Sequence, residues 1–270
     1  VPVLSPADIA SQQRFSGTVE AGDLPWSASP PERLVTLLES LGTDRLVAAF
    51  RITLPNPLWN EAQNITVAAR YLAGKIIAPG ETISGIDLIG PFTTARGYGD
   101  GPGYSAGQLV PVMAGGVCKI GTAMYNVGVY GGLTIVERHP HSMMVPYVPP
   151  GRDAAIATGY KDVRVRNDYD RPLLLWADMD DVTLFIALYG DVEPPTVHWR
   201  HEELAREAPP LERRPNPDLA TGEERLVFAG YDGLTVRTSV VLERPGQPPE
   251  TKVIGTDTYR PLRGIVEYGP

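Results

Sequence analysis

Cys118 is the only thiol in a chain of 270 residues, and the residues around it favour chemistry at sulfur. It follows Gly115 and Gly116 and begins a stretch that predicts a helix, "CKIGTAMYNVGVY". A helix N-terminus carries unpaired N–H groups and about half a positive charge, which stabilise a thiolate and lower the pKa of the thiol. The same N–H groups predict a site for a developing oxyanion. The pattern therefore indicates a cysteine nucleophile.

A nucleophilic thiol requires a base, and the chain has four histidines. His139 and His141 follow Cys118 by 21 and 23 residues, on a strand-like segment beyond the predicted helix. Residues two apart on an extended chain face the same side, although Pro140 between them weakens that geometry. Asp153, in the turn "PPGRDAA", is the expected third member, which would orient the imidazole. The order Cys, His, Asp is that of many thiol hydrolases.

Two other interpretations of this cysteine stay open. Cysteine is among the most buried residue types, so Cys118 also fits a small core side chain beside a tight turn. The second interpretation is a transition-metal site formed by Cys118, His139 and His141, although their spacing is not that of a recognised zinc motif. Under the thiol interpretation we expect neither a metal nor a cofactor.

The segment 90–116 is rich in glycine, with glycines at positions 97, 99, 101 and 103. Their spacing superficially resembles a nucleotide-binding loop, but Pro102 interrupts it, and neither a helix start nor an acidic residue follows at the expected distance. We expect a mobile loop at the rim of a site, because long loops in compact domains tend to border functional sites. Tyr98 and Tyr104, beside these glycines, are expected to line a ligand groove.

The elements that must position these residues follow from hydrophobic spacing. A first helix is predicted between Pro31 and Gly42 by leucines at helical spacing: Leu34, Leu37, Leu38 and Leu41. A second helix, which ends at Gly74, is predicted by one apolar face: Ile65, Ala68, Ala69 and Leu72. The cysteine helix should span 117–130. Strand candidates cluster late, where "PLLLWADMD" and "VTLFIALYG" indicate a hairpin. Early helices and late strands favour an α+β fold with a mixed or antiparallel sheet over a doubly wound parallel sheet.

The chain divides into four predicted parts. Residues 1–50 form an N-terminal extension with the first helix, and residues 51–190 form the main domain. Residues 191–224 predict a linker, because charge and proline rise there and apolar periodicity falls. Residues 225–270 predict two or three strands of a small β module, which is too short to be robust without packing on its neighbour.

Composition limits the partners. The formal net charge of −8 and the pI near 5.1 argue against nucleic acid or an anionic membrane surface, whereas small molecules, peptides, glycans and cationic polymers fit. A single cysteine cannot make an intramolecular disulfide. No run approaches the roughly 18 apolar residues of a membrane span. The first residues, "VPVLSPADIA", are consistent with a signal or membrane anchor upstream of this sequence.

Five ordered blocks between about 51 and 190 resemble the VanW family of bacterial envelope-associated proteins: "NITVAARYLAGKIIAPGETIS", "IGPFTTARGY", "GGVCKIGTAMYN", "GLTIVERHPHSMMVPYVPPGRDAAI" and "DVRVRN". The family's central block typically reads Gly-Gly-Gly-Val-Cys-Gln-Val-Ser-Thr. Here Lys119 stands in place of the glutamine and Gly121 in place of the serine. The family's His-Ser pair falls on His141, which we therefore prefer over His139 as the base. The tail, "VIGTDTYRPLRGIVEYGP", is similar to G5-related β segments found at cell-wall surfaces.

The resemblance implies an extracytoplasmic protein of the cell envelope whose partner is a cell-wall polymer or its peptide. It is compatible with a thiol hydrolase or transferase using Cys118, His141 and Asp153. The alternatives are a non-catalytic wall-binding or scaffolding module accessory to glycopeptide resistance, and a metal-dependent enzyme. The residues expected to contact the ligand are Gly116, Tyr98, Arg96 and Arg152, since the two guanidinium groups would attract a carboxylate-bearing substrate.

Overall fold

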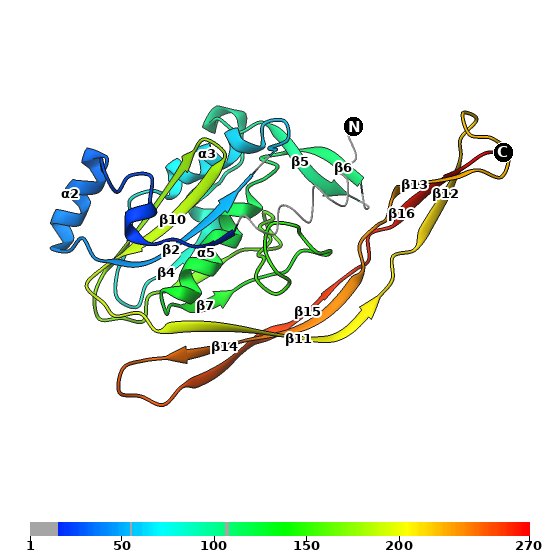
Figure 1. The fold of residues 1–270 in the computed structure, drawn as a ribbon. Coiled ribbons are helices and arrows are strands. Elements are labelled where there is room, and N and C mark those ends of the chain that lie inside the picture. The colour runs from blue at the N-terminus through cyan, green and yellow to red at the C-terminus, as the bar shows by residue number, and fades with distance from the viewer. Residues whose placement is uncertain (1–15, 55, 106–107) are drawn as a thin grey trace.

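The structure, a computed structural model, describes residues 16–54, 56–105 and 108–270 (Figure 1). Its helices are α2 (Glu32–Leu41), α3 (Glu61–Leu72), α4 (Gly85–Ile89) and α5 (Cys118–Tyr130), with short 3₁₀ turns η1 (Ala21–Asp23) and η2 (Thr94–Arg96). The strands of the first two thirds of the chain are β1 (Ser16–Thr18), β2 (Leu46–Thr53), β3 (Lys75–Ile77), β4 (Thr82–Ser84), β5 (Asp100–Ser105), β6 (Gln108–Met113), β7 (Thr134–Glu137), β8 (Arg164–Arg166), β9 (Leu173–Asp180) and β10 (Thr183–Tyr189). The remaining strands are β11 (Thr196–Glu207), β12 (Leu211–Pro215), β13 (Glu224–Phe228), β14 (Gly233–Glu243), β15 (Glu250–Tyr259) and β16 (Gly264–Tyr268).

The main sheet is antiparallel and has the strand order β1-β2-β10-β9-β3. Its central strands are apolar on both faces, and side chains alternate between two cores because successive residues of a strand point to opposite sides. On β10, for example, Leu184 and Ile186 enter the larger core, whereas Phe185 and Ala187 enter the smaller one. The sheet is therefore covered on both faces.

Helices complete the two layers. On one face, α5 packs against β2 and β10 while α3 packs against β9. On the other face, α2 buries Leu34 in the smaller core, together with Trp26 from the preceding segment. Helix α2 ends at Gly42, whose φ of 67° is the left-handed conformation in which glycine is favoured. Helix α5 is apolar nearly all round, and residues 120–129 are buried. The helix that begins with Cys118 thus lies at the centre of the domain.

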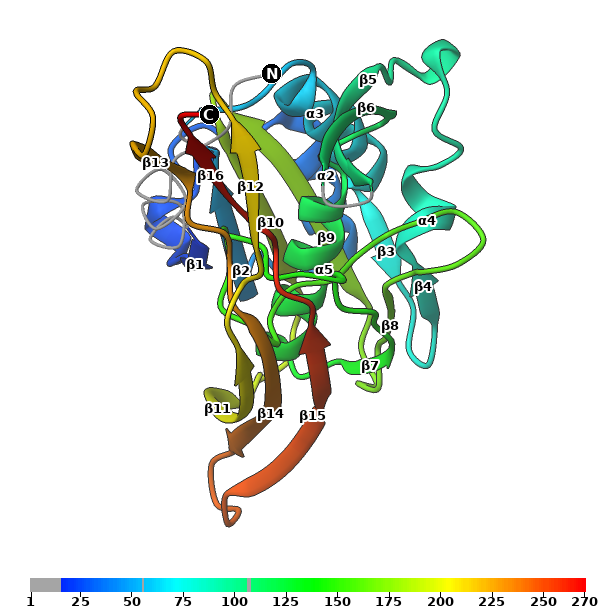
Figure 2. The ribbon, with the colours of Figure 1, turned by 90° about the vertical axis from the view of Figure 1, so that its right-hand side faces the viewer.

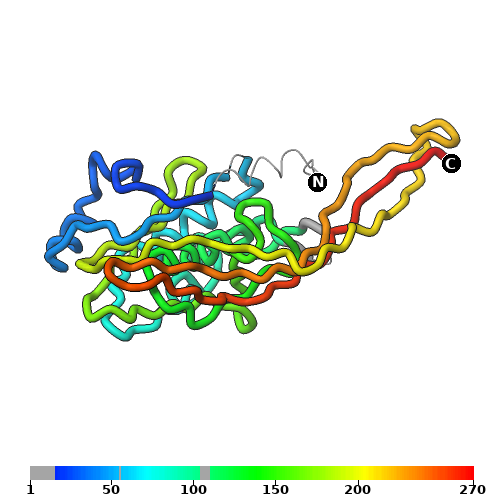
Figure 3. Tube along the Cα trace, turned by 60° about the horizontal axis from the view of Figure 1, so that its bottom comes forward, coloured from blue at the N-terminus to red at the C-terminus, as the bar shows by residue number. Residues whose placement is uncertain are grey.

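Smaller sheets surround this core. One has the order β4-β8-β7, and β5 pairs with β6 in a hairpin. In the C-terminal part, β11-β14-β15 run along the main body, and β12-β16-β13 project away from it (Figures 1 and 3). Figure 2 shows β15 beside the β7 side of the molecule. Val240 and Leu242 of β14 belong to the larger core, so the C-terminal module packs directly on the main domain.

The α+β class, with early helices, antiparallel sheets and a C-terminal β module, is confirmed. The expected loop at 90–116 differs, because it contains the β5–β6 hairpin, in which Pro102 pairs with Pro111. The glycines and prolines concealed the alternation that usually marks strands. Tyr104 lies in this hairpin, at a place where the structure describes only the backbone.

The expected linker at 191–224 also differs, since it contains β11 and β12. Only the first half of β11 has partly buried side chains, Val197 and Trp199, while its charged second half is exposed. The charge that suggested a linker therefore belongs to solvated strand faces. In the N-terminal part, β1 and β2 are strands of the main sheet, so the expected boundary at residue 51 crosses β2. Within the described ranges, no helix has the length and apolar character needed to cross a membrane.

Candidate active site

Two glycines shape the turn that delivers Cys118 to the start of α5. A side chain on Gly115 would place its Cβ 2.2 Å from the carbonyl carbon of Gly101, because β5 crosses directly over this turn. Gly116 has a φ of 102°, which L side chains rarely adopt, and its Cβ would lie 2.8 Å from Glu61 Cγ. Glycine at both positions is therefore a requirement of close backbone approach.

The side chain of Asn64 in α3 stabilises this turn by hydrogen bonds. Its side chain is fully buried, its Nδ2 donates to the carbonyls of Gly99 and Gly115 at 3.0 and 2.9 Å, and its Oδ1 accepts from the N–H of Gly99 at 2.9 Å. Asn64 and Gly115 are buried and Gly99 is half-buried, and an unmet hydrogen bond of a buried group is costly. The amide thus joins α3, β5 and the turn before Cys118 into one unit.

The Cys118 thiol lies against the backbone of Ile156. Its Sγ is 3.5 Å from the Ile156 carbonyl and 3.4 Å from the Ile156 N–H. The carbonyl can accept a bond from the neutral thiol, whereas the N–H can donate to a thiolate. One turn further along α5, the Thr122 hydroxyl accepts from the Ala154 N–H at 2.9 Å. Helix α5 therefore holds the segment 154–156 alongside the sulfur.

His141 and Asp153 are joined by two hydrogen bonds. Asp153 Oδ2 accepts from the backbone N–H of His141 at 2.8 Å and lies 2.7 Å from Nδ1 of its ring. With Nδ1 bound to the carboxylate, Nε2 is the ring nitrogen left for the sulfur. The Asp153 side chain is only 1% exposed, and Arg138 lies 3.0 Å from its Oδ1. The buried carboxylate is therefore both charge-paired and hydrogen-bonded.

The thiol and the imidazole perturb each other. Burial alone would raise the pKa of Cys118, but a hydrogen bond and charge from His141, the Ile156 N–H and the charge of Lys119 together lower it below its ordinary value. Burial alone would lower the pKa of His141, but the hydrogen bonds to Asp153 and Cys118 raise it to about 9. Both shifts favour the ion pair of thiolate and imidazolium over the neutral pair.

Asp153 stays ionised within this cluster. Burial alone would raise its pKa, but the hydrogen bonds from His141 and the charges of His141 and Arg138 lower it. Tyr147 packs edge-on to the His141 ring, with centroids 6.4 Å apart. Burial and the charge of Cys118 raise the pKa of Tyr147, so this phenol stays neutral.

Lys119 and Gly121, which both depart from the family's central block, have structural partners. Lys119 forms an ion pair with Glu61 at 2.5 Å, and its Nζ lies 4.7 Å from the centre of the Tyr147 ring. Gly121 faces Ile156, and a Cβ there would lie 2.8 Å from two atoms of that side chain. Ile156 thus fills the space that a serine would need.

The remaining predicted ligand residues are engaged within the protein. Tyr98 is 2% exposed, and its hydroxyl donates to the Ile89 carbonyl at 2.7 Å. The guanidinium of Arg96 lies 3.7 Å from the centre of the Tyr71 ring. Arg152 donates hydrogen bonds to Asn126 and Tyr130, and its guanidinium packs over the Trp199 ring. Contact of these side chains with a ligand stays a prediction.

His139 does not share the thiol site, since its Nε2 lies 2.9 Å from Glu137 Oε1. Among the residues that the structure describes, no group of three or more His, Cys, Asp and Glu side chains is arranged to hold a metal ion. The metal interpretation therefore gains no support from this geometry.

The helix-start N–H groups are less available than expected. The N–H groups of Val117, Lys119 and Ile120 donate to the carbonyls of residues 114, 116 and 117 at 3.2, 3.0 and 2.9 Å. A tight first turn of this kind satisfies donors that a regular helix start leaves free. An oxyanion pocket built from several of these groups is therefore not preformed.

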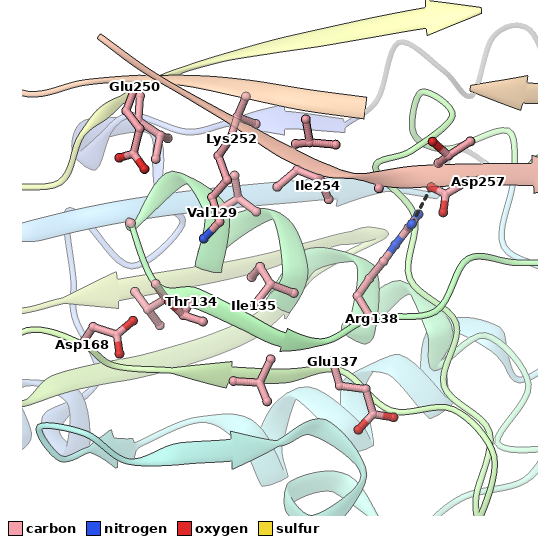
Figure 4. A pocket seen from close by; sticks show the side chains of 18 of the residues that line it. Val129, Thr134, Ile135, Glu137, Arg138, Asp168, Glu250, Lys252, Ile254 and Asp257 are labelled. Carbon is pink, nitrogen blue, oxygen red and sulfur yellow. Dashed lines mark hydrogen bonds and ion pairs between the residues drawn. The ribbon is translucent and has the colours of Figure 1, made fainter. Parts of the chain in front are cut away.

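A cavity of about 660 Å³ lies behind this cluster, between β7 and the C-terminal strands β14 and β15 (Figure 4). Its lining includes Ile135, Ile254 and the ion pair of Arg138 with Asp257, at 2.5 Å. Cys118 and His141 are not among the lining residues. The cavity is therefore separate from the thiol.

The structure is an α+β domain in which Cys118 begins a buried helix and His141 is hydrogen-bonded to Asp153. Residues 60–189 match the family model described as VanW like protein. This region of the chain is similar to the VanW family.

Two relatives share this region. The chain is 35% identical over 131 residues to the uncharacterized protein YoaR of Bacillus subtilis, which covers 48% of this chain and 43% of that protein. It is 30% identical over 145 residues to the vancomycin B-type resistance protein VanW of Enterococcus faecalis, which covers 52% of each. The chain thus spans about half the length of these relatives.

Two solved structures match part of the chain. The G5 domain of an IgA1 protease has 27% identity and a TM-score of 0.19, covering 30% of this chain and 98% of that chain. The G5 domain of HP0197 has 19% identity and a TM-score of 0.17, covering 28% of this chain and all of that chain.

Sequence reasoning missed three residues of this site: Asn64, Thr122 and Tyr259. Asn64 and Thr122 carried a usable signal, because each is a polar residue on an apolar helical face. Tyr259, whose hydroxyl donates to Asp153 Oδ1 at 2.5 Å, comes from 106 residues further along the chain and carried no such signal.

Proposed function

We propose that this protein acts in the cell envelope as a thiol hydrolase or transferase on an amide or ester bond of a wall polymer. Cys118 is the nucleophile, His141 the general acid and base, and Asp153 the group that orients the imidazole. The observation that carries the proposal is the hydrogen bond between His141 and the buried carboxylate of Asp153, beside a thiol whose pKa the imidazole lowers and which raises the pKa of the imidazole in turn.

The chemistry proceeds in two balanced steps. The Cys118 thiolate attacks the carbonyl carbon, and the tetrahedral intermediate collapses to a thioester as the His141 imidazolium gives its proton to the leaving amine or alcohol. In the second step a water molecule or an amine attacks the thioester and gives its proton to neutral His141. The products are an acid or a new amide, and the starting thiolate and imidazolium are restored. Water makes the protein a hydrolase, whereas an amine makes it a transferase.

The substrate class and location rest on the similarity of residues 60–189 to the VanW family. One relative is named a vancomycin B-type resistance protein. We extend to this chain the expectation of a cell-wall polymer or its peptide as the partner. The acidic chain, with a net charge of −8, is compatible with such a partner and disfavours nucleic acid.

Turnover of purified cell-wall material tests the proposal. Wild type is incubated with sacculi, and released or newly joined fragments are followed by mass spectrometry, together with any acyl adduct on Cys118. C118A and H141A are expected to abolish product. H139A is the matched control, because His139 bonds Glu137 and not Asp153, so it should retain turnover. Product formed equally by wild type and C118A would refute a thiol mechanism.

A second candidate function is a non-catalytic wall-binding module. It is favoured by the helix-start N–H groups of Val117, Lys119 and Ile120, which already bond within the protein. In the same experiment this function predicts that wild type and C118A sediment equally with sacculi and that neither forms product.

A further inference from the structure

Tyr259 of β15 reaches the side of Asp153 that faces away from His141. Its hydroxyl donates to Asp153 Oδ1 at 2.5 Å and accepts from the N–H of Gly151 at 2.7 Å. The Tyr259 side chain is 1% exposed, and its ring packs with Leu234 in a small core of the C-terminal module. A residue from the distal end of the chain therefore supplies a buried hydrogen bond to the orienting carboxylate.

A second contact from β15 acts through Arg138. This guanidinium donates to Asp153 Oδ1 at 3.0 Å, to the Asp153 carbonyl at 2.7 Å and to Asp257 Oδ2 at 2.5 Å. Figure 4 shows the Arg138 side chain extended toward Asp257 at one end of the cavity. Arg138 and Asp257 are both largely buried, so this pairing is weakly screened. Asp257 thus shares the positive charge that Arg138 directs at Asp153.

The C-terminal module also contacts the backbone near both His141 and Asp153. Gly151 lies in the left-handed region, with a φ of 84°, and a Cβ there would overlap the Thr238 hydroxyl of β14. Next to His141, the Ser142 carbonyl accepts from the N–H of Arg260 at 2.7 Å. The turn that carries Asp153 and the segment that carries His141 are therefore both fastened to the C-terminal strands.

We propose that Tyr259 and Asp257 are positioning residues for the thiol site, so that the docked C-terminal module completes the Cys118–His141–Asp153 arrangement. Tyr259 and Arg138 together occupy Oδ1 of the carboxylate, which leaves Oδ2 to bind both N–H groups of His141. The module acts through Asp153 and touches neither sulfur nor substrate. This inference rests on the proposed function only for the role of Cys118 as nucleophile.

The two residues make predictions of definite sign. Loss of the Tyr259 hydroxyl frees the carboxylate to turn, which loosens the imidazole and weakens its support of the thiolate. An effect of charge alone would have the opposite sign, because a carboxylate with one fewer donor attracts an imidazolium more strongly. Loss of the Asp257 charge lets Arg138 pair more strongly with Asp153, which weakens the hold of Asp153 on the imidazolium. Both changes should raise the pKa of the thiol.

Other charged and titratable groups also face this cluster, and the variants leave them unchanged: Lys119 from α5, Glu61 from α3, Tyr125 from α5 and Tyr147 from the segment after β7. The wild-type pH profile includes their contributions. The comparison between variants therefore isolates the contribution of β15.

The test is alkylation of Cys118 by iodoacetamide across a pH series in the full chain. At neutral pH, Y259F is expected to react about three- to tenfold more slowly than wild type, with its midpoint moved to higher pH. Y268F makes the same chemical change in the same module, where the ring packs under Arg213, and should match wild type. If Y259F does not fold, D257N carries the test, with slowing in the same direction.

A second comparison separates positioning from a general loss of structure. In an H141A background, Y259F should cause no further slowing, because its effect passes through the imidazole. Equal slowing in both backgrounds, or a variant rate at or above that of wild type, would overturn the inference. If the native wild-type thiol reacts no faster than the denatured chain, the proposed function fails. If the wild-type thiol is reactive and the Y259F and D257N variants react at the wild-type rate, only the proposed role of β15 is refuted.

Discussion

Replacing His141 with alanine is the sharpest test of the thiol site, because His141 is the largest influence that lowers the pKa of Cys118. In H141A the burial of the sulfur is opposed only by the Ile156 N–H and by the charge of Lys119, which is itself paired with Glu61. We expect the pKa of the thiol to rise above that of the wild type.

The size of the effect follows from two opposing dependences. Well below the midpoint, each unit of pKa changes the thiolate fraction about tenfold. The nucleophilicity of a thiolate rises about threefold for each unit by which its pKa rises, which offsets part of that loss. The rate of alkylation should therefore fall about three- to fourfold for each unit of pKa, whereas the thiolate fraction falls about tenfold.

Two measurements check these values in the same samples. Ultraviolet absorbance of the thiolate against pH gives the pKa of Cys118 directly, and iodoacetamide gives the rate. H139A is the control, since it removes a neighbouring imidazole that bonds Glu137 instead. An H141A midpoint equal to or below that of wild type would show that the imidazole does not stabilise the thiolate, and the reasoning would be refuted.

Three further predictions concern stability, measured by urea unfolding. G121S should cost about 1–3 kcal/mol from overpacking against Ile156, and in G121S/I156A the combined cost should be less than the sum of the two single costs, which strict additivity would contradict. N64A should cost about 2–4 kcal/mol, because it leaves the buried Gly115 carbonyl and the Gly99 N–H without partners; a cost under about 0.5 kcal/mol would mean that water replaces Asn64. The His141 pKa of about 9 lies above the value near 6.5 of the unfolded chain, so its contribution is fully present below about pH 6.5 and is lost as pH rises through about 9. H141A should lose less stability over that alkaline range than wild type, and equal losses would contradict the assignment.

Local patterns predicted much of the scaffold. The apolar spacing of α2, α3 and α5 and the turn between β9 and β10 are properties of neighbouring residues, so they are visible along the chain. The same reasoning failed where polar or glycine-rich composition concealed pairing, as in β5–β6 and β11, because the partner strand and not the segment itself stabilises the extended chain.

The sequence by itself determined that a unique thiol follows two glycines at a helix start, and that histidine and aspartate come later in a suitable order. Only the tertiary structure decided that His141, and not His139, bonds Asp153, and that the far side of this carboxylate is held by Tyr259, 106 residues away along the chain. Hydrogen bonds between distant segments depend on distance in space, and that distance is set by how β14 and β15 pack on the domain. Spacing along the chain carries no record of such packing.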